Sequence, residues 1–300
     1  MSSEPIAGTT AGTLRPPHAL AEVRASAPFA RRFLRHRAGV AGAVILLLLI
    51  LLALFAPLIA PYSWAEQNIA IRWQGASRAH FFGTDELGRD IFSRVLYGGR
   101  YSLSIGFGAV LISFAVGVVI GTISGFYRRL DGVIQRIVDV TLAFPTILLA
   151  IAIAAARGPG FFNTIIVIGV TEIPGFIRLT RSSVLSIRER EFVGAARALG
   201  ALDGRIMARH VLPNMVSPIV VFASLRIAGA LLTGATLSFL GLGVPPPKPE
   251  WGAMISTARN NLRVAPHTFF IPTAVLFLAV IAANLLGDAL RDTLDPTLRD

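Results

Sequence analysis

Side chains that could support catalysis are sparse in this sequence. It contains no cysteine and only five scattered histidines, so neither a thiolate nucleophile nor a Cys-bound metal is available. It also lacks a GxxxxGK[ST] phosphate loop, an HExxH zinc motif and a GxSxG nucleophile elbow. We therefore expect no catalytic residue, no metal site and no cofactor bound by this chain. If ATP drives the protein, a different chain must hydrolyse it.

Two charged side chains lie deep within long apolar segments. Glu172 lies about ten residues into the segment 162–179, and Arg226 about thirteen residues into the segment 213–240. If these segments cross a bilayer, both charges approach its centre, where a lone charge costs at least ~2.5–3.5 kcal/mol. Each should therefore face protein or water. Two interpretations remain open: an ion pair that locks the two segments together, or groups that line a pathway and meet a substrate's own ammonium and carboxylate.

A helical face without an evident internal partner lies between residues 190 and 200. Phe192, Ala195, Ala196 and Leu199 recur at i, i+3, i+4 and i+7, so they share one side of a short helix. Because two of the four are alanines, this face is shallow and can seat in a groove of another protein. We interpret it as a docking surface that receives force from a partner.

The residues after this helix predict a turn and a second helix. Gly200 can adopt the left-handed conformation that ends a helix, and Asp203 is a good N-cap for a short helix over residues 204–209. Pro213, preceded by Leu212, marks the start of the next apolar segment. The pattern predicts a helix–turn–helix that lies across one side of the membrane.

The elements that must position these residues are membrane-spanning helices. Hydrophobic residues make up 54% of the chain and charged residues 15%. The apolar blocks run for about twenty residues or more, which at ~1.5 Å per residue covers the ~30 Å hydrocarbon core. Six spans are predicted, with no soluble domain between them, over residues 40–60, 102–126, 138–156, 162–179, 213–240 and 268–286.

The predicted spans divide the chain into three parts, and the charges of the loops predict on which side of the membrane each loop lies. We expect a disordered cytoplasmic tail, a six-span domain and a short cytoplasmic tail, over residues 1–37, 38–292 and 293–300. Lys and Arg concentrate in the first tail and in the loops after spans two and four, so both termini and the loop 181–212 are predicted to be cytoplasmic. The loops 61–100 and 241–266 are then external. The net charge of +11 reflects this topology and not a basic face for nucleic acid.

Small residues and prolines predict how the spans pack. Gly117, Gly121 and Gly125 recur every four residues, which favours close contact with a neighbouring helix. Four prolines lie within predicted spans, where neighbouring helices must satisfy the freed carbonyls; they are Pro145, Pro174, Pro218 and Pro272.

The external loops also look structured. Leu87, Ile91 and Val95 form an apolar stripe at helical spacing, which predicts a short amphipathic helix on the outer surface before span two. Asp90 and Arg94 are expected to pair across one turn of that helix. In the last external loop, Trp251 suits the membrane interface.

The cytoplasmic loop carries a resemblance to a known family. Its pattern Ala195-Ala196-x3-Gly200-x9-His210-x-Leu212-Pro213 resembles the "EAA" loop of ABC importer permeases, whose consensus is EAA-x3-G-x9-I-x-L-P. The chain departs from it at Gly194, where Glu is usual, and at His210, where Ile is usual. The resemblance implies that the loop is a coupling helix that docks into an ATPase subunit.

Three further blocks narrow the resemblance. Residues 82–90, 237–243 and 284–296 resemble the dipeptide/oligopeptide/nickel permease family, in its second-subunit type. This implies an all-α, six-span bundle of the type I ABC importer kind in the bacterial cytoplasmic (inner) membrane, surrounded by lipid. It also implies a heterodimer with a sister permease, two cytoplasmic ATPases that hold ATP and Mg, and an extracytoplasmic substrate-binding protein.

The sequence leaves alternatives open for the substrate and for the energy source. Within the family, peptides are the expected substrate, and nickel chelates, oligosaccharides and opines remain open. A secondary transporter driven by an ion gradient would need membrane carboxylates for ions and no docking loop. An intramembrane enzyme would need a nucleophile or metal cluster at membrane depth, and the sequence shows neither.

Overall fold

The computed structural model describes residues 29–294, and this part of the chain is helical apart from loops and one isolated bridge between Thr84 and Asp90. The helices are α1 Phe29–Arg35, α2 Arg37–Leu54, α3 Ala56–Ile59, η1 Ile69–Ile71, α4 Ile91–Phe126, α5 Arg128–Leu142, α6 Thr146–Arg157, α7 Phe161–Arg188, α8 Glu191–Ala198, α9 Asp203–Ile206, η2 Met207–Val211, α10 Leu212–Phe239, α11 Trp251–Ala258, η3 Arg259–Asn261 and α12 His267–Leu294.

The predicted tails need correction where they are described. Residues 29–35 form the helix α1 and α2 already begins at Arg37, so disorder does not extend to residue 37 as expected. At the other end α12 runs to Leu294, past the predicted boundary. The remaining parts of both predicted tails, residues 1–28 and 295–300, lie outside the described residues.

Five of the six predicted spans each contain one helix that is long enough to cross a membrane, although in the first, 40–60, α2 ends at Leu54 and the short helix α3 follows. Within residues 29–294, five helices are long and apolar enough to cross a membrane: α2, α4, α7, the continuous segment Asp203–Phe239 that includes α10, and α12. The third predicted span, 138–156, is wrong as one straight helix, because α5 and α6 meet at an angle of 89°. Pro145 lies at the break. It has no N–H for the helical ladder, and it disfavours helical geometry in the residue before it.

The predicted outer helix before span two is also wrong. α4 begins at Ile91 and continues as one helix of 36 residues, so the apolar stripe belongs partly to a span. Asp90 does not pair with Arg94. Its carboxylate caps α4 by accepting the Ser93 N–H at 2.7 Å and lies 3.0 Å from His80 Nδ1. Arg94 instead lies 3.4 Å from a carboxylate oxygen of Asp85.

The glycine strip of α4 packs against α7, as predicted. A Cβ added at Gly121 would lie 2.6 Å from the Thr180 Cβ, and one at Gly117 would lie 2.3 Å from the Phe176 Cβ. The α7 residues that contact these glycines are also four residues apart, so rows of residues with the same period pack against each other. Only glycine allows this approach, because any side chain would force the two helices apart.

Trp251 does not lie at a membrane interface, contrary to the prediction. It is buried against α4, and its indole Nε1 donates to the Val95 carbonyl at 3.0 Å. The preceding Glu250 is also buried and caps α11. Its carboxylate accepts a hydrogen bond of 2.8 Å from the Ser102 hydroxyl of α4. These bonds tie the last loop to the start of span two.

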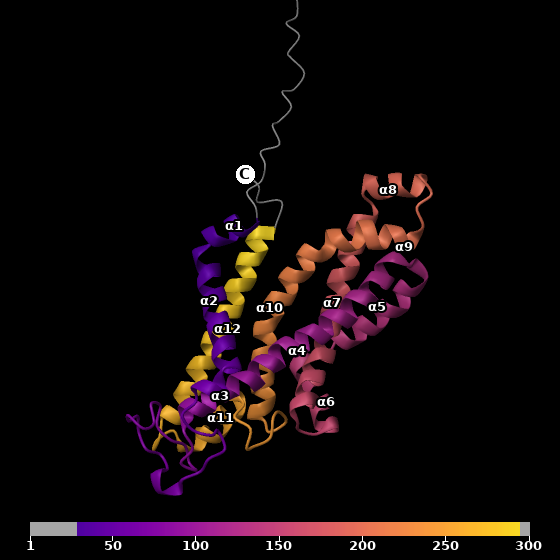
Figure 1. Ribbon diagram of the computed structural model, residues 1–300. Coiled ribbons are helices and arrows are strands. Elements are labelled where there is room, and N and C mark those ends of the chain that lie inside the picture. The colour runs from indigo at the N-terminus through magenta and orange to yellow at the C-terminus, as the bar shows by residue number, and fades with distance from the viewer. Residues whose placement is uncertain (1–28, 295–300) are drawn as a thin grey trace, which may run out of the picture.

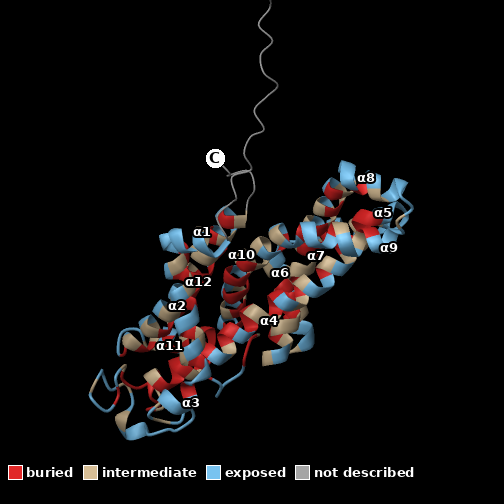
Figure 2. Cartoon of the chain, turned by 45° about the horizontal axis from the view of Figure 1, so that its top comes forward, coloured by how far each residue is buried: buried red, intermediate tan, exposed pale blue. Residues whose placement is uncertain are grey.

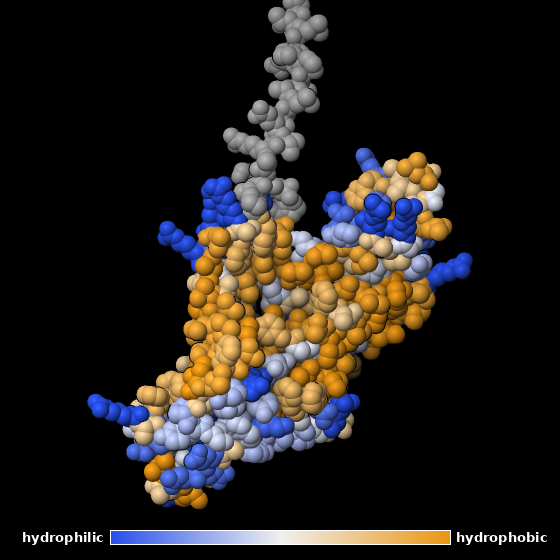
Figure 3. All heavy atoms as spheres, viewed as in Figure 1, coloured by the Kyte–Doolittle hydropathy of each residue, from blue (hydrophilic) through white to orange (hydrophobic). Residues whose placement is uncertain are grey.

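The helices form a bundle with two polar ends. α8 and α9 project from the same end as α1 and the last turn of α12, and α3 and α11 lie at the opposite end (Figure 1). Buried residues gather where α4, α7 and α10 meet, whereas α8 is mostly exposed (Figure 2). An apolar belt separates the two polar ends (Figure 3). This arrangement matches an all-α membrane protein that presents α8 to water.

Candidate functional site

The helix α8 is held to the bundle by one face and presents the other to solvent. Val193 is fully buried in the apolar core. Phe192 and Ala195 are exposed, Ala196 is half-buried, and Leu199 is 88% exposed. The structure therefore places most of the predicted docking surface outside the chain's own core. An apolar side chain as exposed as Leu199 gains nothing from its own fold.

The turn after α8 has the predicted geometry. Gly200 has φ +82°, in the left-handed region. Its N–H donates to Arg197 O at 3.0 Å, and the next N–H, of Ala201, donates to Ala196 O at 3.1 Å. This is the Schellman pattern, in which two bonds satisfy the last free carbonyls of a helix. The prediction of a glycine helix end at this position is confirmed.

The prediction that Asp203 caps the second helix is wrong. The N-cap is Leu202, which has no side-chain hydrogen bond, and Asp203 is the first residue of α9. The carboxylate of Asp203 instead lies 3.7 Å from Arg197 Nη2 of α8. This ion pair spans the turn, so the charge of Asp203 connects the two helices of the hairpin instead of ending one of them.

The second helix of the hairpin is not separate from span five. α9 passes through the π-helical turn η2 into α10, so Asp203–Phe239 is one continuous segment. Pro213 lies in the first turn of α10, where its missing N–H is tolerated, and Leu212 precedes it and bonds to Met207 O across the π turn.

The two deep charges lie together in the structure. Arg226 Nη1 of α10 is 3.4 Å from Glu172 Oε2 of α7. The side chain of Glu172 is 11% exposed and that of Arg226 is 42% exposed. The guanidinium carbon also lies 4.6 Å from the centre of the Phe222 ring, a favourable cation–π distance. The ion-pair interpretation requires this proximity, and the pathway interpretation is compatible with it.

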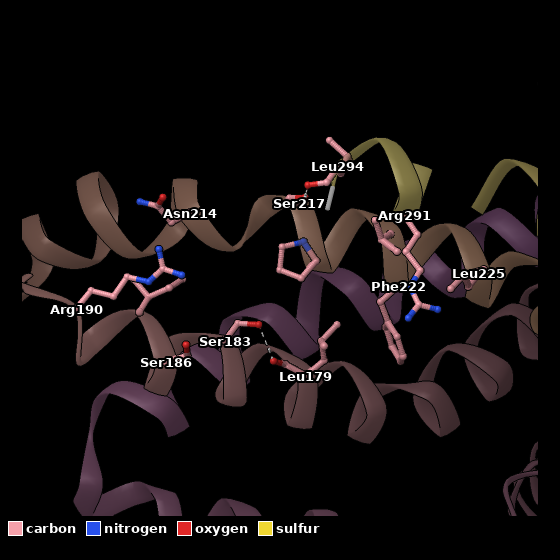
Figure 4. A pocket seen from close by; sticks show the side chains of 13 residues that line it. Leu179, Ser183, Ser186, Arg190, Asn214, Ser217, Phe222, Leu225, Arg291 and Leu294 are labelled. Carbon is pink, nitrogen blue, oxygen red and sulfur yellow. Dashed lines mark hydrogen bonds between the residues drawn. The ribbon is translucent and has the colours of Figure 1, made fainter. Parts of the chain in front are cut away.

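A groove of about 710 Å³ lies between α7, α10 and α12. It extends from Arg190 and Asn214, next to α8, to Phe222 and Leu225 in the middle of α10 (Figure 4). Arg291 of α12 lines the same end as Phe222 (Figure 4). The sequence did not indicate this groove, because its walls come from three segments far apart in the chain. Within residues 29–294, no cluster of three His, Asp or Glu residues could hold a metal ion.

Comparisons with known proteins point to transport. Residues 117–300 match the family described as "binding-protein-dependent transport system inner membrane component", and residues 28–75 match the "N-terminal TM domain of oligopeptide transport permease C". A dipeptide transport system permease protein, DppC of Alkalihalophilus pseudofirmus, is 47% identical, with 88% of each chain covered. A glutathione transport system permease protein, GsiD of Pectobacterium atrosepticum, is 46% identical over 90% of this chain and 91% of its own.

The fold also resembles a solved structure. The inward-facing MetNI methionine ABC transporter matches 67% of this chain and 97% of its own matched chain, with a TM-score of 0.53 and 17% identity. At this identity the likeness concerns the fold alone. It agrees with the helical bundle described above.

Proposed function

Since this chain belongs to the family of binding-protein-dependent transport system inner membrane components, we propose that it imports peptides as one half of a permease heterodimer. Membership in the family implies ATPase and substrate-binding-protein partners. The names of the dipeptide and glutathione permeases support a peptide substrate over nickel chelates, oligosaccharides or opines. ATP and Mg are held by the partner ATPases, and this chain supplies the pathway and no catalytic group.

The observation that carries the proposal is the exposed face of α8. The coupling surface, defined here as Phe192, Ala195, Ala196, Leu199 and Gly200, is apolar and shallow and lies at the tip of a hairpin. Such a face has a role only if a second protein covers it. A movement of an ATPase bound to α8 passes through the short turn at Gly200 to α9, and because α9 continues into α10 it then reaches the middle of the membrane along one helical segment. An ion-driven carrier has no need of this element.

An experiment that identifies the energy source of transport tests the proposed function. The chain, its sister permease and two ATPases are reconstituted in vesicles with the substrate-binding protein, and uptake of radiolabelled dialanine is measured. Uptake should require both ATP and the binding protein, and an imposed proton or sodium gradient should not replace ATP. Gradient-driven uptake by vesicles without the ATPases would instead establish a secondary transporter.

The proposed orientation places α8 in the cytoplasm, together with both termini. Because the chain has no cysteine, single cysteines can report sidedness without background. Lys248→Cys, in the exposed loop before α11, should react with a membrane-impermeant maleimide in intact cells. Arg205→Cys, exposed in α9, should react only after permeabilisation. Labelling of Arg205→Cys in intact cells would reverse the orientation.

A further inference from the structure

The ion pair in the middle of the bundle is asymmetric. Glu172 is mostly covered by protein, whereas nearly half of the Arg226 side chain is accessible. A guanidinium has five N–H donors, and one carboxylate oxygen 3.4 Å away uses few of them. Stacking on Phe222 fixes the plane of the guanidinium without using its donors. Glu172 therefore contacts one edge of the guanidinium through Nη1, which leaves N–H donors that this carboxylate does not use.

The accessible side of Arg226 cannot face lipid. A charged group at this depth is costly in hydrocarbon and is found against protein or a water-filled cavity. The groove ends at Leu225, which precedes Arg226 in α10, and at Phe222, whose ring lies 4.6 Å from the Arg226 guanidinium. Ser183, Ser217 and Asn214 add polar groups along its length. The groove, lined by both polar and apolar side chains, thus leads from the α8 end of the bundle to the Phe222 ring beside the guanidinium.

The charged residues that line the groove have one sign, and Glu172, the partner of Arg226, is not among them. Arg190 lines one end of the groove and Arg291 the other, and the lining contains no Asp or Glu. A planar guanidinium matches a carboxylate in geometry and can bind both of its oxygens. The groove volume of about 710 Å³ lies within the range of roughly 300–1,000 Å³ that small ligands occupy. The site therefore suits a short molecule with a carboxylate at one end.

We propose that this groove is the wall of the translocation pathway contributed by this chain, and that Arg226 and Arg291 bind the carboxylate of the passing peptide. The proposal rests on the proposed function and names the group on the substrate that this chain recognises. Glu172 is then a positioning residue, because it acts through Arg226.

A cysteine beside Arg226 tests the groove directly. A Cβ at Gly175 would lie 3.5 Å from Phe222 Cζ and 3.8 Å from Arg226 Nη2, both ordinary contacts, so Gly175→Cys should fold. The assembled importer is treated with an anionic and a cationic methanethiosulfonate reagent. The rate at which each reagent labels the new thiol is divided by the rate at which the same reagent labels a free thiol in water. The anionic reagent should be favoured by about twofold or more, because the Arg226 guanidinium lies nearer the new thiol than the Glu172 carboxylate that partly offsets its charge.

Three comparisons complete the test. Adding Arg226→Gln, or Arg291→Gln if the first variant does not assemble, should remove much of this preference. Dialanine should slow the labelling, and dialanine amide, which lacks the carboxylate, should not. Leu111→Cys, an exposed position of α4 outside the groove, should react with neither reagent.

The outcomes separate this inference from the function. If Gly175→Cys reacts with neither reagent while the importer still takes up dialanine with ATP, the groove is covered and the inference is wrong, but the function stands. A charge preference that survives both arginine substitutions, or equal protection by the amide, overturns the carboxylate site. If labelling favours the anionic reagent and dialanine slows it, but the importer moves no peptide, the groove assignment stands and the proposed peptide substrate is wrong.

Discussion

Replacing Leu199 with glutamate is expected to reduce ATP-driven uptake at least tenfold while the chain folds and inserts normally. Leu199 is 88% exposed, so its removal takes no apolar area from the core. On the proposed coupling surface, however, a charge would have to be buried against an ATPase. Loss of a hot-spot residue from an interface costs ~2 kcal/mol or more, which is a weakening of about thirtyfold. Binding of the ATPases is measured by their retention when the chain is purified. Transport is measured by dialanine uptake in vesicles.

A matched control is available at the opposite end of the bundle. Val264 is an exposed apolar residue in the loop before α12, and Val264→Glu makes the same kind of change away from α8. This variant should keep its ATPases. If Leu199→Glu also keeps them and transports like the parent, the coupling surface is misassigned.

Replacing Gly121 with leucine is expected to destabilise the folded chain strongly. The Cβ alone would lie 2.7 Å from the Ile177 carbonyl oxygen and 2.6 Å from the Thr180 Cβ. These atoms belong to the backbone and to the base of a side chain, so no rotamer change relieves the contact and α4 must move away from α7. Overpacking a close contact costs about 1–3 kcal/mol, and occasionally more. We expect a value at the upper end, with much less folded protein in detergent and a lower midpoint of thermal unfolding.

Gly229→Leu in α10 makes the same substitution where the structure has open space. No atom lies within 4 Å of a Cβ built there, and leucine has the better helix propensity. Its yield and unfolding midpoint should equal those of the parent or exceed them. A normal midpoint for Gly121→Leu would show that α4 and α7 pack less closely than described.

Features that depend on one segment were predicted correctly. The length of an apolar block and the cost of exposing backbone to lipid define a span without reference to the rest of the chain, so five of the spans are found where expected. The end of α8 at Gly200 is also local, because a φ of +82° strongly favours glycine. The face of α8 that points outward follows from helical periodicity alone.

Features that depend on a partner elsewhere in the chain were missed or wrong. Asp90 could pair with Arg94 by spacing, but His80 and the end of α4 compete for the same carboxylate. Trp251 was assigned to the membrane interface because tryptophan is a common residue type there. In the structure, Val95 and the glycines of α4 provide a pocket for its side chain. Such competitions are decided by three-dimensional contacts, and a sequence pattern carries no information on which partner is nearer.

The sequence by itself determined that this chain crosses a membrane, that it contains no cysteine and no GxxxxGK[ST], HExxH or GxSxG motif, and that it presents an apolar helix at one end. Each of these follows from the polarity or spacing of neighbouring residues. Only the tertiary structure decided that Glu172 and Arg226 meet, that a groove leads to them and that α9 continues into α10. A groove exists only between segments, so its walls and its charge are set by how α7, α10 and α12 pack.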